Sequence, residues 1–332
     1  MGLNISGLIN RDIIKTLTLD NFFGKDIGID AFNVIYQFLS VIRDNRNRPL
    51  KNINGDITSH LSGLFYRNIK LLESNIKPIY IFDGKKKDKK LRHSNINKPK
   101  YYVSINDNII SSSKVLLKFM GIQSIQAIGE GEAQGVYMAN KGDVWATASQ
   151  DYDVLIYGGD RLIRNLAIGS SRKKGDIIIN LNIEFIKLSK FLDLYGITKD
   201  RLVELSVLIG NDYFCGVKGL GAMTAMKLIQ KCETFYDIKF NNNSLYNGNI
   251  ILKDKTIMAK EVLYSTYKYY KNLFLNPEVN MDYRIKRIKP DYEGLYNYLT
   301  VNNFSISRVE NGIKRLRNVN SKYRQSMMSD YM

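Results

Sequence analysis

Apolar and polar positions in the first half of the chain form two alternating patterns. Apolar runs at 25–30, 78–84 and 144–148 have the length of buried strands. The segments 31–42 and 58–74 instead carry apolar residues three and four positions apart, which is the period of a helix with one buried face. Strands that alternate with helices in this way predict an α/β fold with a mostly parallel central sheet flanked by helices.

The rest of the chain continues with elements of both kinds. We expect helices at 106–120, 133–140, 182–195, 199–209, from 222 onward, and within 256–275 and 291–300. Two strand-like pieces, 161–166 and 176–181, are joined by a basic turn that contains Arg172, Lys173 and Lys174. No linker interrupts residues 1–317, so we expect one domain made of an N-terminal block (1–105), an internal block (120–240) and the remaining helices. The polar tail, 318–332, is expected to be disordered up to its last eight residues.

The charge balance narrows the class of partner. The net charge is +17 and the isoelectric point is near 9.5, so a polyanion such as nucleic acid is the expected partner. Cys215 and Cys232 are the only cysteines, and they have no CxxC spacing, which fits a reducing, intracellular setting. No signal peptide and no apolar run near 18 residues is present, so neither secretion nor membrane insertion is indicated.

Acidic residues recur where the predicted strands end. A single acid-x-acid pair is more often a solvated turn than a site, but here two pairs accompany three further acids in a basic chain. Carboxylates beyond the carboxyl ends of parallel strands lie where open sheets bind ligands. Because such groups repel one another, they require cations, and oxygen ligands favour Mg²⁺ or Mn²⁺. The candidate metal ligands are Asp30, Asp83, Glu130, Glu132, Asp151, Asp153 and Asp212.

Two further motifs suit phosphate. The glycine-rich turn at 216–221 opens a helix at Ala222, so its backbone N–H groups can approach a phosphate closely. Such a turn is weak evidence alone, but directly after Asp212 it favours a clamp on a duplex backbone. The lysine-rich run at 85–92 is either a solvated segment or a guide for phosphates, and its position after Asp83 favours the second interpretation.

With these motifs in this order, the chain resembles the structure-specific 5′ nucleases, and within them the archaeal and eukaryotic flap endonucleases. The blocks that carry the resemblance are 29–39, 58–67, 82–84, 129–134, 149–153 and 210–213. The resemblance implies a 5′ flap endonuclease and 5′–3′ exonuclease that hydrolyses DNA phosphodiester bonds at branched junctions, in Okazaki fragment maturation and in repair. It also implies two Mg²⁺ ions, for which Mn²⁺ could substitute. Asp30, Asp83, Glu130 and Glu132 would hold one, and Asp151, Asp153 and Asp212 would hold the other.

The resemblance also assigns DNA contacts. The segment 206–232 would be a helix–two-turn–helix that grips duplex DNA, with K⁺ as a possible ligand. Tyr36 would stack on the nucleotide at the scissile junction, and Lys90 would neutralise the scissile phosphate. The implied catalytic group is Tyr36, Lys90 and Asp212, and the implied DNA contacts are Gly2, Arg43, Arg67, Glu130, Gly210, Asp212, Gly219 and Gly221.

The chain departs from the family in the segment between Asp83 and Glu130. Only 46 residues separate Asp83 from Glu130, so the helical arch through which a 5′ flap threads is expected to be reduced. The gateway arginine of the family falls on Asn97, with Arg92 and Lys98 as nearby substitutes. At the other end, 325–332 has the form Q-x-x-M-x-x-Y-M, similar to motifs that dock on sliding clamps. The docking residues would be Gln325, Met328, Tyr331 and Met332.

Two alternatives remain. One is a sister activity on the same scaffold, namely junction resolution or resection-type exonuclease action, which the compact length disfavours. The other is a non-catalytic protein that binds DNA junctions, which seven mutually repelling acids disfavour. His60 and His93 are not expected to be catalytic. We expect a monomer, located in the cytoplasm or nucleoid if archaeal, which we favour, and in the nucleus if eukaryotic.

Overall fold

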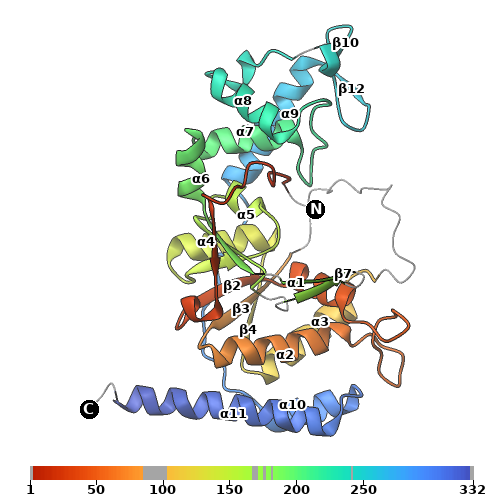
Figure 1. Cartoon of the computed structure of the whole chain (residues 1–332), viewed down its shortest axis with the longest axis vertical. Helices are drawn as coiled ribbons and strands as arrows, with labels where there is room; N and C mark the ends of the chain where they lie inside the picture. Colours follow the sequence, from red (N-terminus) through yellow and green to blue (C-terminus); the bar gives the residue numbers. More distant parts are fainter. Residues whose placement is uncertain are drawn as a thin grey trace.

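The computed structural model describes residues 3–84, 103–166, 171–174, 177–180, 182–240 and 242–329. Within these ranges it describes the backbone alone at 171–174, 177–180, 242 and 320–329. The molecule is elongated, with a sheet at its middle (Figure 1). Helices α8 (Ala222–Lys231) and α9 (Lys260–Leu275) lie at one end, and α10 (Tyr292–Val301) and α11 (Ile306–Ser329) lie at the other.

Seven strands form the central sheet. In spatial order they are β1 (Ile14–Leu17), β9 (Ile183–Lys187), β6 (Arg161–Arg164), β5 (Ala146–Ala148), β2 (Asp26–Asp30), β3 (Lys77–Phe82) and β4 (Gln123–Gln126). The five strands from β6 to β4 run parallel to one another, whereas β9 is antiparallel to both β6 and β1. The prediction of a mostly parallel sheet is confirmed, and the carboxyl ends of β2, β3, β4 and β5 meet at one edge.

One face of the sheet packs against helices from both ends of the chain. Helices α1 (Ala31–Val41), α2 (Ser59–Glu73) and α3 (Asp107–Phe119) cover it, and α10 and α11 form an outer layer over α2 and α3. Tyr80 and Phe82 of β3 point into this core and are fully buried. Arg315 of α11 forms two hydrogen bonds with Glu73 at the end of α2, both 2.7 Å long.

The other face packs against the middle of the chain. Helix α4 (Gly131–Lys141) covers β2, β3 and β5, and Ile79 and Ile81 of β3 point to this side. Both sets of alternate residues on β3 are therefore buried, as expected for a parallel strand covered on both faces. Helices α5 (Asp153–Ile156), α6 (Leu188–Tyr195) and α7 (Lys199–Ile209) continue this layer toward α8 and α9.

The end of the molecule that carries α8 and α9, here called the far lobe, packs around α7. Helices α8 and α9 both contact α7, and a three-stranded sheet of β10 (Leu245–Tyr246), β11 (Asn249–Ile251) and β12 (Ile257–Met258) adjoins α9. A separate hairpin consists of β7 (Ser171–Lys174) and β8 (Ile177–Asn180). Short 3₁₀ helices lie at η1 (Leu19–Phe22), η2 (Phe235–Asp237) and η3 (Asn242–Ser244).

Three details of the sequence-based prediction are wrong. The start of the helix expected at 182–195 is instead β9, which inserts between β1 and β6, and Phe185 stacks on Trp145 with ring centroids 5.5 Å apart. Pairing with β1 and β6 makes this segment a strand, because its short apolar run is compatible with either a helix or a strand. The expected basic turn at 172–174 is part of strand β7.

The third error concerns the tail. The backbone of α11 continues without interruption from Ile306 to Ser329, where disorder was expected at 318–324. The polar composition suggested disorder, but 318–329 contains no glycine or proline that would end the helix. In the described ranges, no helix combines the length and the apolar character that a membrane span requires.

Candidate metal centre

Asp30 ends β2 and caps the amino terminus of α1. Its Oδ1 accepts a hydrogen bond from the backbone amide of Asn33 (3.1 Å), and its Oδ2 accepts one from the hydroxyl of Ser149 (3.1 Å). Burial and then the charge of Asp83 raise the pKa of Asp30 to about 6, although hydrogen bonds with the Glu132 side chain and the Asn33 amide oppose this shift. The ionised form of Asp30 is therefore costly without a neighbouring cation.

Three more carboxylates gather beside Asp30. Asp83 directly follows β3, and its Oδ1 accepts a hydrogen bond from the amide of Gly131, the first residue of α4 (2.9 Å). Asp83, Glu130 and Glu132 each offer an oxygen that lies within 4.8 Å of the others. A Cβ at residue 131 would lie 2.9 Å from Asp83 Oδ1, so glycine permits this close approach. The first predicted set of metal ligands thus comes together at the sheet edge.

Asp151 and Asp153 follow β5 at the same edge. Asp151 Oδ2 accepts a hydrogen bond from the side-chain amide of Asn33 (3.2 Å), and its charge contributes to the raised pKa of Asp30. Asp153 is 6% exposed, and its Oδ1 accepts a hydrogen bond from the backbone amide of Leu3 (2.6 Å). The amino-terminal segment therefore reaches this group of acids.

Asp212 belongs to the far lobe and lies three residues beyond the end of α7. The next residue, Tyr213, donates a hydrogen bond from its hydroxyl to Glu130 Oε1 (2.6 Å). Within the described residues, one group of three or more acidic, histidine or cysteine side chains has its ligand atoms all within 4.8 Å of one another, and it consists of Asp83, Glu130 and Glu132. The second set of ligands, Asp151, Asp153 and Asp212, stays a prediction.

This donor set fits a hard divalent cation. Two unit charges 4 Å apart repel by about 4 kcal/mol at an effective dielectric of about 20, and several such pairs meet here. Carboxylate oxygens are the ligands that Mg²⁺ and Ca²⁺ prefer in proteins. A bound cation would replace this repulsion with attraction.

Sequence reasoning assigned no role to several residues that shape this centre. Asn33, Ser149 and Tyr213 lie inside the motif blocks, but only the structure shows which carboxylate each one contacts. Their partners are 83 to 119 residues away in the chain, and no local spacing records such contacts. Leu3 adjoins the expected Gly2 contact, but it acts through its backbone amide, which any residue except proline supplies.

The predicted DNA contacts on α1 and α2 occupy different environments. Tyr36 is 45% exposed on α1, and Arg43 is half-buried just beyond that helix. Arg67 is 8% exposed, and its Nε donates a hydrogen bond to the carbonyl of Leu166 (2.8 Å). Burial lowers the pKa of Arg67 to about 10. This inward position favours a structural role for Arg67, and its contact with DNA stays a prediction.

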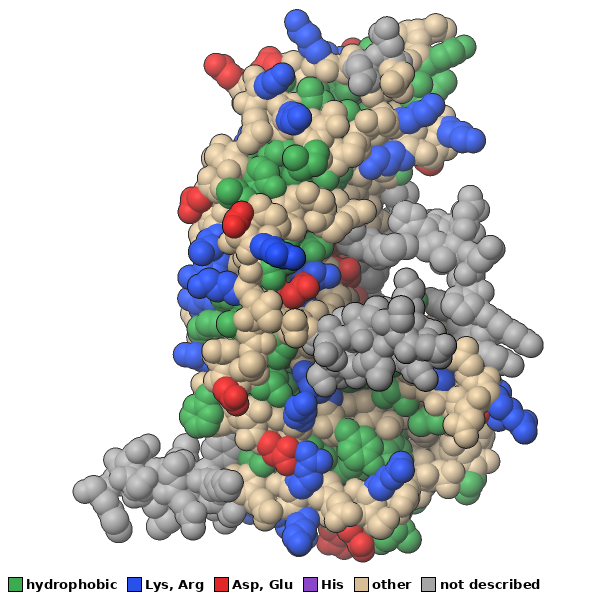
Figure 2. All heavy atoms as spheres, in the orientation of Figure 1, with side chains coloured by type: hydrophobic (Ala, Val, Ile, Leu, Met, Phe, Trp, Pro, Cys, Tyr) green, Lys and Arg blue, Asp and Glu red, His purple; other side chains and the backbone are tan. Residues whose placement is uncertain are grey.

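The glycines of the predicted clamp lie between α7 and α8. Gly210 ends α7, and Gly221 caps the amino terminus of α8. Gly219 has φ +78°, a conformation that other residues rarely adopt, and both Gly219 and Gly221 are exposed. Lys and Arg side chains gather at the end of the molecule that carries α8 and β12 (Figure 2). The exposed lysines here include Lys218, Lys227 and Lys231.

Several predicted residues lie outside the described part of the chain. They are Gly2, Lys90, Arg92, Asn97, Lys98, Tyr331 and Met332. Gln325 and Met328 belong to the backbone of α11, but their side chains are not described. The lysine, the reduced arch and the clamp-docking motif therefore stay predictions.

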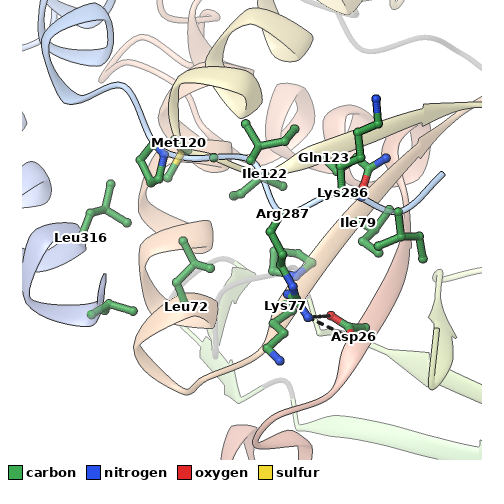
Figure 3. Close-up of a pocket in the computed structure, with 16 residues that line it drawn as sticks. Asp26, Leu72, Lys77, Ile79, Met120, Ile122, Gln123, Lys286, Arg287 and Leu316 are labelled. Atoms are coloured by element: carbon green, nitrogen blue, oxygen red, sulfur yellow. Dashed lines mark hydrogen bonds and ion pairs between the residues drawn. The ribbon is translucent and has the colours of Figure 1, made fainter. Parts of the chain in front are cut away.

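A cavity of about 340 Å³ lies at the opposite edge of the sheet (Figure 3). Its walls include Asp26, Lys77 and Gln123, which begin β2, β3 and β4, together with 285–288 and Leu316 of α11. Arg287 forms an ion pair with Asp26 at 3.3 Å. The carboxylates of the candidate centre do not line this cavity, since they follow the other ends of the strands.

Comparison with known proteins agrees with this geometry. The XPG N-terminal domain matches residues 2–100, and the XPG I-region matches residues 121–212. The chain is 39% identical to flap endonuclease 1 of Pyrococcus horikoshii over 100% of its own length and 98% of the relative. It is 38% identical to flap endonuclease 1 of Picrophilus torridus over the full length of both.

A solved structure agrees as well. Flap endonuclease-1 from Methanococcus jannaschii superimposes with a TM-score of 0.77 and 31% identity, over 97% of this chain and 100% of that one. Identity at this level over whole chains, with the acidic centre at the edge of the sheet, shows that the chain belongs to the flap endonuclease 1 family.

Proposed function

We propose that this protein is a structure-specific 5′ flap endonuclease with 5′–3′ exonuclease activity, which hydrolyses DNA phosphodiester bonds at branched junctions with Mg²⁺. The observation that carries the proposal is the group of Asp83, Glu130 and Glu132 oxygens within 4.8 Å, beside a buried Asp30. Full-length relatives named flap endonuclease 1 support this substrate over the alternatives of a junction resolvase and a resection exonuclease.

Two groups of acidic residues would bind the cations that hydrolysis requires. Asp30, Asp83, Glu130 and Glu132 would hold one Mg²⁺, and Asp151, Asp153 and Asp212 a second, with Mn²⁺ as a possible substitute. Bound divalent cations supply an activated water and positive charge at the phosphate. Ser149 and Asn33 fix the carboxylates of Asp30 and Asp151 by hydrogen bonds, so that their oxygens are oriented before substrate arrives.

DNA would lie across the edge of the sheet and the far lobe. The turn from Gly216 to Gly221, in which Lys218, Gly219 and Gly221 are exposed, and helix α8 would contact the phosphates of the duplex, with a K⁺ ion as a possible ligand. Tyr36, Arg43 and Lys90 would contact the DNA near the scissile bond. Phosphate contacts of this kind recognise shape and charge without reading the base sequence.

The proposed substrate indicates where in the cell the protein would act. Flap removal serves Okazaki fragment maturation and repair, so the protein would work inside the cell, in the cytoplasm or nucleoid of an archaeon. We propose one nuclease domain at 1–317 that acts as a monomer and docks on the sliding clamp through Gln325, Met328, Tyr331 and Met332.

A labelled double-flap DNA tests the proposal. Incubation with Mg²⁺ should release the 5′ flap, and incubation with EDTA should leave the substrate intact while binding persists. A four-way junction and a plain duplex with a recessed end serve as competing substrates. Preferential cleavage of the four-way junction would favour a resolvase, and binding without cleavage of any substrate would favour the non-catalytic alternative.

A further inference from the structure

Tyr213 links the far lobe to the carboxylates. It follows Asp212 directly, it is 7% exposed, and its hydroxyl donates a hydrogen bond of 2.6 Å to Glu130 Oε1. The two residues are 83 positions apart in the chain and lie on different units of the fold. Glu130 immediately precedes α4, whereas Tyr213 belongs to the connection between α7 and α8.

Tyr213 is held on several sides. Its backbone amide donates to Oδ1 of Asn211 (2.9 Å), and its carbonyl accepts a hydrogen bond from the hydroxyl of Tyr270 in α9 (2.8 Å). Its ring packs edge-on against Phe274 of α9, with centroids 6.1 Å apart. Because both the backbone and the ring are fixed, the hydroxyl has little freedom to leave Glu130.

The surroundings of this bond are largely buried. Tyr157, which packs against Phe274 at 5.2 Å, is 5% exposed. Its burial, and then its nearness to Tyr213 and Glu130, raises the pKa of Tyr157 well above the usual range. A hydrogen bond to a carboxylate is electrostatically stronger in such low-dielectric surroundings than in water. The Tyr213 bond can therefore set the orientation of the Glu130 carboxylate.

We propose that Tyr213 is a positioning residue for the metal centre. It turns the Glu130 carboxylate so that, with Asp83 and Glu132, it presents oxygens to one cation. Because Tyr213 lies in the same connection as Gly219 and Gly221, it also joins the duplex-contacting turn to a metal ligand. This inference rests on the proposed metal-dependent function and adds the residue that couples the far lobe to that site.

The test compares Tyr213→Phe with a matched control, Tyr267→Phe. Phenylalanine keeps the ring contacts of Tyr213 and removes only the hydroxyl. Tyr267 in α9 donates an equivalent buried hydrogen bond to a glutamate, Glu204 Oε1 at 2.8 Å, within the far lobe. Calorimetric titration with Mn²⁺ in the absence of DNA measures cation binding by wild type and both variants. Near-UV circular dichroism checks that all three are folded.

Removal of a group that orients a metal ligand typically weakens metal binding about 10- to 100-fold. We expect Tyr213→Phe to bind Mn²⁺ at least about tenfold more weakly and to need correspondingly more Mg²⁺ for half-maximal flap cleavage. Its affinity for flap DNA in EDTA should equal that of wild type, and Tyr267→Phe should match wild type in all three measurements.

The outcomes separate this inference from the proposed function. Unchanged Mn²⁺ binding in Tyr213→Phe, or equal weakening in Tyr267→Phe, would overturn the role of Tyr213 and leave the metal-dependent function intact. A lower cleavage rate at every Mg²⁺ concentration, without weaker Mn²⁺ binding, would overturn it as well. Failure of the wild type itself to cleave flap DNA at any Mg²⁺ concentration would instead overturn the proposed function.

Discussion

The side-chain amide of Asn33 donates a hydrogen bond to Asp151 Oδ2 at 3.2 Å, while the backbone amide of the same residue donates to Asp30 Oδ1 at 3.1 Å. One residue in the first turn of α1 thus joins carboxylates from the ends of β2 and β5. This link connects members of the two predicted sets of metal ligands, which are adjacent because they follow the paired strands β2 and β5.

We predict that Asp151→Ala or Asp212→Ala abolishes cleavage of flap DNA and leaves DNA affinity within about tenfold of wild type. The metal-activated water is lost, but the basic contacts to phosphate remain. Neutralisation of one carboxylate also relieves repulsion, so the stability of the metal-free protein should not fall. Single-turnover cleavage and equilibrium binding measure the two effects.

Asp193→Ala serves as the control, because Asp193 is exposed in α6, away from the sheet edge. It should cleave like wild type. Cleavage by Asp151→Ala at the wild-type rate would remove Asp151 from the metal centre.

The strand-end acids could be predicted because their signal is local. Asp30 and Asp83 each end an apolar run, and the alternation of strands with helices aligns those ends at one edge. The contact between Tyr213 and Glu130 could not be predicted, because it depends on how α9 holds the connection after α7. The same limit explains β9, since its pairing with β1 and β6 outweighed an ambiguous local pattern.

The second prediction concerns the glycine-rich turn between α7 and α8, which is proposed to grip duplex DNA. Gly221→Val should weaken binding to duplex-containing DNA, because a branched side chain at the start of α8 keeps phosphates away from its backbone N–H groups. Residue 221 has φ −85° and open space around its Cβ position, so valine should not strain the fold. The loss should not depend on base sequence. Binding to flap, duplex and short single-stranded DNA measures it.

Gly219 makes the less informative variant. With φ +78°, its replacement by valine strains the backbone by about 1–3 kcal/mol and mixes lower stability with lost contacts. If Gly221→Val lost affinity equally for short single strands, the assignment of this turn to duplex binding would be wrong.

The third prediction concerns pH and His60. This residue is fully buried, and burial lowers its pKa from 6.5 to about 4. The native protein therefore keeps His60 neutral where the unfolded chain takes up a proton, so stability is lost as pH falls from about 6.5 to about 4. The contribution is at most about 3 kcal/mol. Asp30 acts in the opposite sense in metal-free protein, because its raised pKa of about 6 favours the native state over part of the same range.

Variants separate these opposing effects. In urea denaturation with EDTA at pH 7 and pH 4.5, His60→Gln should lose less stability on acidification than wild type, and Asp30→Asn should lose more. The comparison uses the change within each protein, so an overall cost of either substitution does not matter. Parallel pH dependence in all three proteins would contradict the buried, neutral state of His60.

The last prediction concerns the carboxyl-terminal tail. Deletion of 325–332 should leave cleavage of naked flap DNA unchanged and remove stimulation by the sliding clamp of the same organism. Glutamine, aliphatic and aromatic side chains at the spacing of Gln325, Met328 and Tyr331 suit a short turn that fills an apolar pocket. The final position is Met332, where an aromatic residue is usual in such motifs, so the contact should be weak.

The helical backbone up to Ser329 adds a requirement, since a turn of this kind needs the last helical residues to unwind. Such unwinding lowers the net affinity, because part of the binding energy is spent on reordering the segment. A second variant, Tyr331→Ala with Met332→Ala, removes two of the three apolar side chains of the motif and keeps the described helix intact. It should lose stimulation as the deletion does. Equal stimulation of wild type and both variants by the sliding clamp would contradict the docking role of the tail. Loss of stimulation in the deletion variant alone would assign the effect to the length of α11 rather than to the motif.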